Sequence, residues 1–368
     1  MPGDIPDKMK AVICHGPGDY RLETVKTPRA GRGEMLVEVL ACGVCASDSK
    51  CHSGAPVFWG DEHREPFVDG PVIPGHEFVG RVMEMGKGAG ELHGIDPGDL
   101  VVPEQIVPCR ECRYCRKGQY WLCQVHNIFG FQRAVNGGMA EYALLPERAI
   151  VHRVPDGIPP RKAAMIEPLA CSIHAVERAR IEIGDVVVIA GAGTLGLGMI
   201  GAARLRSPSL LVSLDLLDYR LEIAQEMGAD ITINPSREDP IERVSSFTDG
   251  YGCDVYIEAT GHPQAVVQGL HMIKKLGTFV EFSLFREPVT ADWTIIGDAK
   301  ELNVHGAHLS PYTFPNAIDL INRGMVDVNR IVTHVVPLDR HADAFGMVAA
   351  ARDSVKVLLR PAIGDQTD

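Results

Sequence analysis

The stretch that decides the fold is Val186-Val-Val-Ile-Ala-Gly-Ala-Gly-Thr-Leu-Gly-Leu-Gly198. Its apolar start, Val186 to Ile189, is typical of a parallel strand that is buried on both faces. The run ends in Gly191, Gly193 and Gly196, which have the G-x-G-x-x-G spacing of a dinucleotide-binding turn. In such a turn the first glycine permits a sharp bend, the second admits a pyrophosphate, and the third lets a helix pack closely on the strand.

A second apolar run strengthens this interpretation, because the glycine turn alone would also fit a structural role. Leu210-Leu-Val-Ser-Leu-Asp215 ends in an acid about 20 residues further on, where a carboxylate can bind ribose hydroxyls. Such an acid favours NAD, because it would repel the 2′-phosphate of NADP. Arg220 could receive that phosphate, but it would have to overcome the nearby acid. The predicted cofactor-binding residues are Gly191, Gly193, Thr194, Leu195, Gly196, Asp215, Arg220 and Thr260.

Composition limits the class of protein. A chain of 368 residues suits two domains, and its 45% hydrophobic content supplies apolar material for both. The net charge of −12, without a basic stripe, argues against nucleic-acid binding. The polar start, Met1 to Lys8, and the lack of a run of about 18 apolar residues predict a cytoplasmic protein without a membrane span. In a reducing compartment the ten cysteines are expected to be thiols or metal ligands rather than disulfides.

Four of the cysteines are grouped in one polar loop. Cys109, Cys112, Cys115 and Cys123 have the spacing C-x2-C-x2-C-x7-C. Four thiolates can close a tetrahedral site that leaves no open position for a substrate, which favours a structural zinc ion. An iron–sulfur site is the alternative, because three cysteines at x2 spacing also occur there. Its fourth cysteine would come three residues on and precede a proline, whereas here seven residues intervene and Gln124 follows.

Three other segments carry candidate catalytic groups. Cys45 is a candidate metal thiolate, with the hydroxyl of Ser47 and the carboxylate of Asp48 close behind it. Gly75-His76-Glu77 places an imidazole beside a carboxylate. Glu167 lies in an otherwise apolar helix predicted from Pro159 to Arg180, where a carboxylate is costly unless it is paired or bound to a cation.

Two further cysteines and one aromatic segment have ordinary structural interpretations. Cys42 and Cys171 are interpreted as packed core thiols. The irregular segment from His52 to Pro74 carries Phe58, Trp59 and Phe67. These aromatic side chains either cover the core or line the mouth of a substrate site.

The remaining pattern predicts an α/β protein. Short strands and turns from Lys10 to Val39 indicate an all-β opening. Beyond Asp215, strands and helices alternate as far as Ser283, which predicts a right-handed doubly wound parallel sheet. From about His308 the pattern changes again, and this tail is expected to rejoin the first domain. The predicted domains are 1–174, 175–307 and 308–368.

Taken in order, these segments resemble the zinc-dependent medium-chain alcohol dehydrogenases, and most of all their sorbitol and polyol dehydrogenase branch. The resemblance covers nearly all of Lys10 to Pro361. It rests on Gly43-Val-Cys-Ala-Ser-Asp48, Gly75-His-Glu77, the four-cysteine loop, Glu167-Pro-Leu169 and the glycine turn. It implies a GroES-like, β-rich catalytic domain with two zinc sites, a Rossmann domain that binds NAD, and a C-terminal segment that returns to the catalytic domain.

The resemblance also implies a ligand set for a catalytic zinc ion. Cys45 and His76 would bind it. Glu167, where alcohol dehydrogenases have a cysteine and polyol enzymes a glutamate, would do so directly or through a water. Glu77 would exchange onto the zinc as substrate or water comes and goes, and Asp48 would orient the His76 imidazole.

The implied reaction is the oxidation of a secondary hydroxyl of a polyol to a ketose, with hydride transfer to NAD. Ser47 would take the hydroxyl proton, and Lys50 or His52 would relay it onward; both also suit ordinary surface positions. One residue departs from the sorbitol dehydrogenases: Leu309 stands where they have an arginine that helps to hold the polyol. The loop from Cys45 to His76 is also longer than in those enzymes. The expected substrates are therefore threitol or erythritol as well as sorbitol or xylitol.

Two other functions compete with this prediction. A threonine-type amino-alcohol or butanediol dehydrogenase would share the scaffold, but the threonine type needs an anion-binding group that the sequence does not reveal. A zinc-stabilised dinucleotide-binding protein without activity would predict a damaged catalytic set, whereas Cys45, His76 and Glu167 are all present. A homotetramer or homodimer is usual for such relatives.

Overall fold

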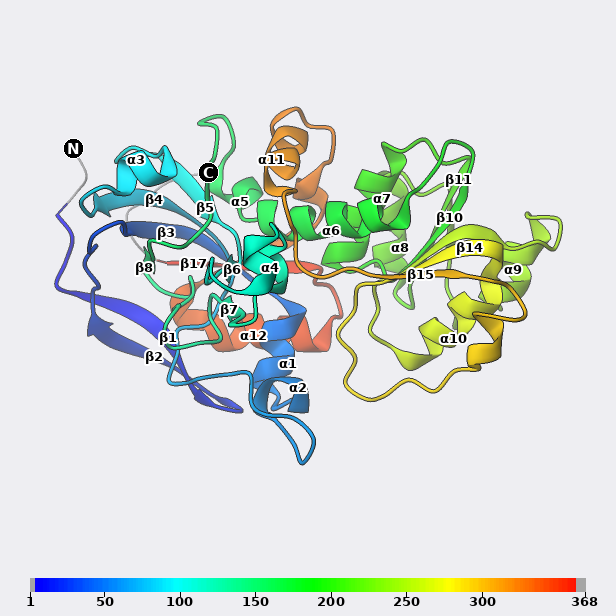
Figure 1. Ribbon diagram of the computed structural model, residues 1–368, viewed down its shortest axis with the longest axis horizontal. Helices are drawn as coiled ribbons and strands as arrows, with labels where there is room; N and C mark the ends of the chain where they lie inside the picture. Colours follow the sequence, from blue (N-terminus) through cyan, green and yellow to red (C-terminus); the bar gives the residue numbers. More distant parts are fainter. Residues whose placement is uncertain (1–3, 362–368) are drawn as a thin grey trace. The chain divides into compact units, whose positions relative to one another are not determined.

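The computed structural model describes residues 4–361, which form two compact units (Figure 1). The first unit runs up to Glu167 and also contains Ala317–Arg323 and the chain from Val332 onward. The second unit contains Pro168–Asn316 and Gly324–Ile331. The three-part division at 1–174, 175–307 and 308–368 stays a proposal.

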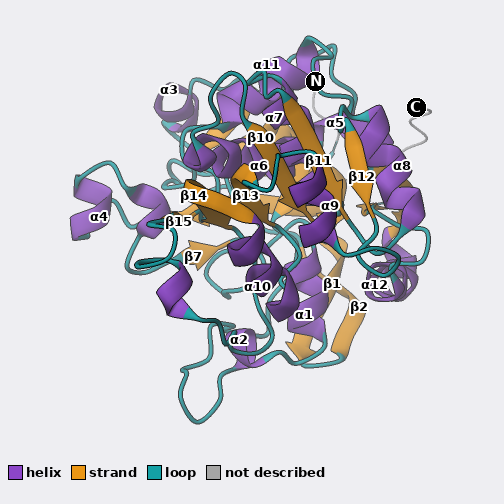
Figure 2. Cartoon of the chain, turned by 90° about the vertical axis from the view of Figure 1, so that its right-hand side faces the viewer, coloured by secondary structure: helices purple, strands orange, loops and turns teal. Residues whose placement is uncertain are grey.

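The second unit is built on a parallel sheet that has six strands within the described residues. Its strand order is β12-β11-β10-β13-β14-β15, and every neighbouring pair is parallel. The central strands are continuous apolar runs because helices flank the sheet on both faces (Figure 2). The doubly wound fold is therefore confirmed. The strands are β10 (Val186–Ala190), β11 (Leu210–Leu214), β12 (Ile231–Ile233), β13 (Cys253–Glu258), β14 (Ile273–Glu281) and β15 (Asn303–Gly306).

The strand order reverses beside β10. Strands β11 and β12 extend the sheet to one side of β10, and β13, β14 and β15 extend it to the other. In open α/β sheets such a reversal leaves a crevice at the carboxyl ends of the strands, where ligands bind. The connecting helices are α7 (Thr194–Arg204), α8 (Asp218–Glu226), α9 (Pro240–Ser246) and α10 (Pro263–Met272).

The glycine turn lies at this reversal, between β10 and α7. Gly191 has a φ of +98°, in the region that favours glycine. A Cβ added to Gly196 would lie 1.7 Å from the Gly191 carbonyl oxygen, so a side chain there would force the helix away from the strand. Gly191 is thus required by its backbone conformation, and Gly196 by the close approach of α7 to the turn.

The first unit is rich in strands. Its main sheet has seven strands within the described residues, in the order β16-β17-β3-β4-β5-β9, with β8 also paired to β3. Strands β1 and β2 form a hairpin, and β6 pairs with β7. These strands are β1 (Lys8–Gly16), β2 (Asp19–Lys26), β3 (Met35–Val44), β4 (Glu77–Met85), β5 (Leu100–Pro103), β6 (Ile106–Val107), β7 (Asn127–Ile128), β8 (Tyr142–Leu145), β9 (Val151–Arg153), β16 (Val332–Pro337) and β17 (Lys356–Arg360).

Short helices join these strands, and one expected helix is broken. The segment from Pro159 to Arg180 forms two helices rather than one, because Pro168 lacks the N–H that a continuous helix would need to reach the carbonyl of Ala164. A proline is tolerated in the first turn, so the second helix begins just before it. The helices are α1 (Ala46–His52), α2 (Pro56–Trp59), α3 (Ala89–His93), α4 (Arg113–Arg116), α5 (Pro160–Ala163), α6 (Ile166–Ala179), α11 (Phe314–Asn322) and α12 (His341–Ala350).

Two further observations concern membrane helices and disulfides. In the part of the chain from residue 4 to residue 361, no helix has the length and apolar character needed to cross a bilayer. All ten cysteines lie in that part and are free thiols, as expected from the sequence.

We predict that Gly196→Ala lowers the free energy of unfolding by about 1 to 3 kcal/mol, because the added methyl group collides with the glycine turn. Gly297→Ala is the matched control in the same unit, since its added Cβ meets nothing within 4 Å. That variant should stay within about 0.5 kcal/mol of the parent. Urea denaturation followed by circular dichroism measures both, and equal stabilities would contradict the packing constraint.

Candidate active site

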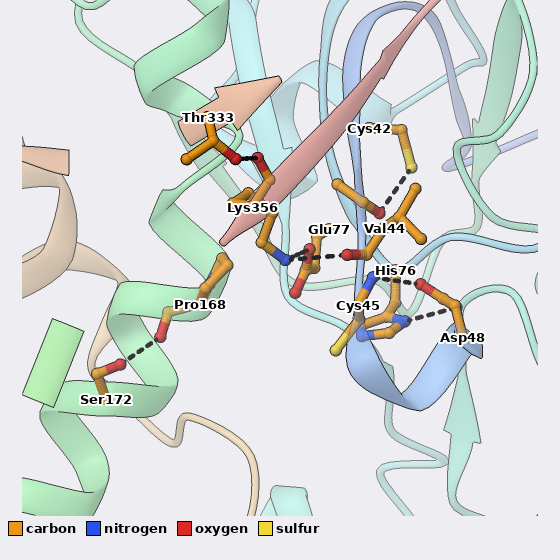
Figure 3. Close-up of polar contacts among 11 residues, drawn as sticks. Cys42, Val44, Cys45, Asp48, His76, Glu77, Pro168, Ser172, Thr333 and Lys356 are labelled. Carbon is orange, nitrogen blue, oxygen red and sulfur yellow. Dashed lines mark hydrogen bonds and ion pairs between the residues drawn. The ribbon is translucent and has the colours of Figure 1, made fainter. Parts of the chain in front are cut away.

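Three metal-ligand side chains from separate segments meet at the paired ends of β3 and β4. Cys45 follows β3 and precedes α1, His76 precedes β4, and Glu77 is the first residue of β4. Their donor atoms lie within 4.8 Å of one another. The antiparallel register pairs Gly43 with Glu77, which brings the two strand ends together (Figure 3). His76 and Glu77 are buried, and Cys45 is half-buried.

Asp48 lies against two members of this group. Its Oδ2 atom accepts a 2.9 Å hydrogen bond from the backbone N–H of Cys45, and its Oδ1 atom lies 3.6 Å from Nδ1 of His76. Burial by itself lowers the pKa of His76, but Asp48 and Cys45 outweigh it and raise that pKa well above its usual range. A carboxylate beside Nδ1 holds a proton on that nitrogen, so a metal ion would bind at Nε2 by displacing the proton there.

Glu167 lies in the first turn of α6 and is 4% exposed. It does not belong to the group of three donors within 4.8 Å, as far as the described residues go. Whether Glu167 would reach a metal ion directly or through a water therefore stays a prediction. Cys171, one turn further along α6, is buried, which fits a core thiol.

The donor set has the chemistry of a cation site. Three carboxylates, on Asp48, Glu77 and Glu167, are buried in the same unit as Cys45, and each is less than 5% exposed. Buried anions are costly unless they are paired or bind a cation. Sulfur, imidazole and carboxylate ligands together suit zinc. The residues that are present therefore fit a zinc ion.

Sequence reasoning missed one charged member of this site, Lys356 in β17. The lysine is 2% exposed, and its Nζ atom lies 2.5 Å from Oε2 of Glu77 (Figure 3). The same Nζ donates to the carbonyl oxygen of Val44 at 3.4 Å. Burial alone lowers the pKa of Lys356, but Glu77 and Cys45 outweigh burial and raise that pKa, so the amine is charged. The signal in the sequence was a single lysine within the apolar run from Val355 to Leu359.

The four cysteines of the loop also converge. Their sulfur atoms lie within 4.8 Å of one another, and those of Cys109 and Cys115 are 3.9 Å apart. The backbone N–H of Cys112 donates to Sγ of Cys109 at 3.3 Å, and the backbone N–H of Gln124 donates to Sγ of Cys112 at 3.4 Å. Such donors favour thiolates: the N–H groups of Gln124 and Cys115 lower the pKa of Cys112 to about 6. A closed set of four thiolates fits a structural zinc ion.

The candidate proton-relay residues lie on or at the end of α1. Ser47 and Lys50 are half-buried. The His52 ring contacts Tyr20 and Phe345, at centroid distances of 4.9 and 5.1 Å, and burial lowers the pKa of His52. His52 therefore packs into an aromatic cluster in this structure, and the relay roles stay predictions.

Aromatic rings cover one side of His76. Phe131 lies 5.5 Å from the His76 ring and stacks on Phe58 at 5.2 Å, while Phe67 lies 5.6 Å from Phe131. Phe58 is buried, whereas Trp59 and Phe67 are half-buried. Phe58 thus belongs to the core, and Phe131 is an aromatic neighbour of the donor group that sequence reasoning did not identify.

In the second unit, the predicted cofactor residues gather around the glycine turn. Asp215 accepts hydrogen bonds from the N–H groups of Ala192 (2.7 Å) and Leu217 (2.9 Å). Its carboxylate is thereby held at the carboxyl end of β11, beside the turn. A Cβ added to Gly193 would lie 3.8 Å from Nη1 of Arg220, and one added to Gly191 would lie 3.1 Å from Cγ2 of Thr260.

These contacts give the turn the features of an anion site. Gly193, Thr194 and Leu195 are half-buried, Gly196 is buried, and α7 begins at Thr194. The first N–H groups of a helix have no partner within the helix and can bind phosphate oxygens. Arg220 adds a positive charge beside Gly193. The turn therefore fits the pyrophosphate of a dinucleotide.

Leu309 lies in the same unit, in the loop between β15 and α11. It is half-buried and has a φ of +54°. A leucine supplies no hydrogen-bond donor, so the polar anchor that sorbitol dehydrogenases have at this place is absent at Leu309.

Two family models match the chain. The alcohol dehydrogenase GroES-like domain matches residues 31–156, and the zinc-binding dehydrogenase model matches residues 194–323. The first match lies within the β-rich first unit, and the second covers most of the parallel-sheet unit. They confirm the fold class expected from the sequence.

Several proteins are similar over almost the whole chain. An erythritol/L-threitol dehydrogenase of Mycolicibacterium smegmatis is 51% identical over 98% of this chain and 100% of its own length. An L-threonine 3-dehydrogenase of Pyrococcus horikoshii is 34% identical over 96% of this chain and 99% of its own. A solved structure from Sinorhizobium meliloti 1021, described as a zinc-binding dehydrogenase bound to NADP, has a TM-score of 0.87 and 30% identity, covering 97% of this chain and 100% of its own.

Proposed function

Because this chain belongs to the zinc-dependent medium-chain alcohol dehydrogenase family, we propose that it oxidises a secondary hydroxyl of a short polyol to a ketose. The observation that carries the choice of substrate is the 51% identity to an erythritol/L-threitol dehydrogenase over 98% of the chain. The donor group of Cys45, His76 and Glu77 supports the same reaction, because its mixed ligands suit a catalytic rather than a closed zinc site.

The proposed reaction uses a zinc ion, a nicotinamide cofactor and the side chains around them. When bound, zinc acts as a Lewis acid toward the substrate hydroxyl, and the oxidised nicotinamide accepts a hydride from the substrate carbon. Cys45 and His76 would hold the zinc, together with Glu167 directly or through a water. Asp48, 3.6 Å from Nδ1 of His76, would fix the ring orientation.

The substrate loses a proton as well as a hydride when the alcohol becomes a ketone. Ser47, the second residue of α1, would accept the hydroxyl proton and pass it toward solvent, with Lys50 or His52 as outer groups. The cofactor would lie on the glycine turn, with its pyrophosphate at Gly193 and its ribose hydroxyls at Asp215. The expected cytoplasmic location and homo-oligomeric state also stay predictions.

A threonine-type amino-alcohol dehydrogenase is the second candidate, since such an enzyme is 34% identical to this chain. Its substrate carries a carboxylate and an ammonium group where a polyol carries hydroxyls. The lower identity and the lack of an evident carboxylate-binding group in the sequence make the polyol the better choice.

We predict two zinc ions per chain with separable roles. Cys45→Ser should abolish turnover while the fold and one zinc ion remain, because Cys45 belongs to the mixed donor group. Cys112→Ser should lower the unfolding temperature, because Cys112 belongs to the four-thiol group. Metal analysis and thermal denaturation of both variants measure the outcome. Loss of both ions from the Cys45 variant, or full activity of that variant, would refute the division.

We predict that NAD is preferred over NADP by at least about tenfold in kcat/KM, since a carboxylate at Asp215 repels a 2′-phosphate. Asp215→Asn should reduce that ratio. Asp298→Asn, which removes an exposed carboxylate elsewhere in the same unit, should leave it unchanged. Equal kcat/KM values of the parent protein for the two cofactors would sink this prediction.

We predict that vicinal polyols are better substrates than simple alcohols, and that four-carbon polyols are at least as good as hexitols. Leu309 removes a polar anchor worth roughly 0.5 to 1.5 kcal/mol, which changes specificity by up to about tenfold and can reorder related polyols. Steady-state assays with erythritol, threitol, xylitol, sorbitol, butane-2,3-diol, threonine and ethanol measure the order. Threonine or ethanol as the best substrate by kcat/KM would show the polyol proposal to be wrong.

A further inference from the structure

Two charged side chains beside the turn that follows β11 have no role in the proposed function. Asp218 is the first residue of α8, three positions after Asp215, and Arg237 lies in the segment between β12 and α9. The carboxylate of Asp218 forms an ion pair with the guanidinium of Arg237. Both side chains reach solvent, with 46% of Asp218 and 68% of Arg237 exposed. A bound ligand could therefore compete for either partner.

The parallel pairing of β11 with β12 places this ion pair at the edge of the sheet where the cofactor is expected. Asp215 and Asn234 directly follow these two strands, so they emerge at the same carboxyl edge. The backbone N–H of Asp215 donates to the carbonyl oxygen of Ile233 at 3.3 Å, which ties the two strand ends together. Asp218 and Arg237 each come three residues later. They therefore lie beside the place at which Asp215 would bind a ribose.

Asn234 fixes the position of the Asp218 carboxylate. The asparagine is 7% exposed, and its Nδ2 atom donates to Oδ1 of Asp218 at 2.9 Å and to the carbonyl oxygen of Leu216 at 3.0 Å. Its Oδ1 atom accepts hydrogen bonds from the backbone N–H and the hydroxyl of Ser236, at 3.0 and 2.6 Å. Both donors and both lone pairs of this buried amide are thus engaged. Because Oδ1 of Asp218 is held in this way, its Oδ2 atom faces Arg237.

The chemistry of Arg237 suits the phosphate that distinguishes NADP from NAD. That phosphate replaces the 2′-hydroxyl that Asp215 is placed to bind, and a nearby arginine is what accommodates it in proteins that use NADP. A guanidinium can bind a phosphate through two parallel hydrogen bonds. Here, however, Nη2 of Arg237 is bonded to the carboxylate of Asp218, and the charge of Asp218 would itself repel a phosphate.

We propose that Asp218 is a second specificity-determining residue for the cofactor: it binds Arg237 and so withholds this cation from the 2′-phosphate of NADP. The inference rests on the proposed function, in which Asp215 holds the ribose hydroxyls of NAD. Discrimination against NADP then comes from two acids that act in different ways. Asp215 repels the phosphate, whereas Asp218 occupies the arginine that would bind it.

The size of the effect follows from the exposure of the pair. An exposed ion pair changes an equilibrium by up to about fivefold. Asp218→Asn alone should therefore raise the ratio of kcat/KM for NADP to kcat/KM for NAD by about two- to fivefold, because Asp215 still repels the phosphate. In Asp215→Asn/Asp218→Asn the phosphate can approach the released Arg237. The double variant should then exceed the product of the two single effects by about threefold or more.

The experiment measures kcat/KM for NAD and NADP in the full-length protein, and the dissociation constants of both cofactors by isothermal titration calorimetry. The variants are Asp215→Asn, Asp218→Asn, the two combined, and the two combined with Arg237→Met. Asparagine keeps the shape of Asp218 and can still accept the hydrogen bond from Asn234. Asp230→Asn is the matched control, because Asp230 forms an ion pair with Arg204 in the same unit but precedes β12, at the opposite edge of the sheet.

We expect Arg237→Met to cancel the excess of the double variant, because the gain in NADP binding comes from the arginine, and Asp230→Asn to leave the ratio unchanged. If the triple variant does not fold, Arg237→Gln takes the place of Arg237→Met with the same expectation. A double variant that shows only the product of the single effects would overturn the inference, and so would a gain that survives the loss of Arg237. Failure of the proposed function looks different: calorimetry would then show no binding of NAD or NADP to the parent protein.

Discussion

The antiparallel pairing of β3 with β4 is the interaction on which the donor group depends. β3 ends at Val44 and β4 begins at Glu77, so Cys45 and His76 lie just beyond two paired strand ends. Side chains alternate between the faces of a sheet, so a slip of one residue would turn Glu77 to the opposite face. The register therefore decides which face Glu77 points to, and with it whether the carboxylate meets Cys45.

The parts of the molecule that could be predicted from sequence are those with local signals. The glycine spacing and the apolar runs gave the parallel sheet, because strand and turn preferences act within a few residues. The four-cysteine group was also evident, since its ligands are close in sequence. Pro168 was a local signal for the break before α6. The prediction of one continuous helix gave more weight to the apolar pattern around Pro168 than to its missing N–H.

The partner of Glu77 had no such signal. Lys356 and Glu77 are 279 residues apart, and their contact depends on the registers of β17 with β3 and of β3 with β4. Neither register follows from composition or periodicity in the segments themselves. Cys45, His76 and Glu77 are also brought together by strand register rather than by a local pattern. Their roles at a metal ion were therefore expected from the resemblance to a family and not from their spacing. Phe131 was missed for this reason as well.

The place of Lys356 in β17 has a consequence for how the protein is made. A ribosome reaches this codon after those for Cys45, His76, Glu77 and Glu167, so the lysine is the last of these residues to be synthesised. The buried ion pair with Glu77 therefore cannot form until Lys356 has been translated, whereas the four-cysteine group is already complete at Cys123.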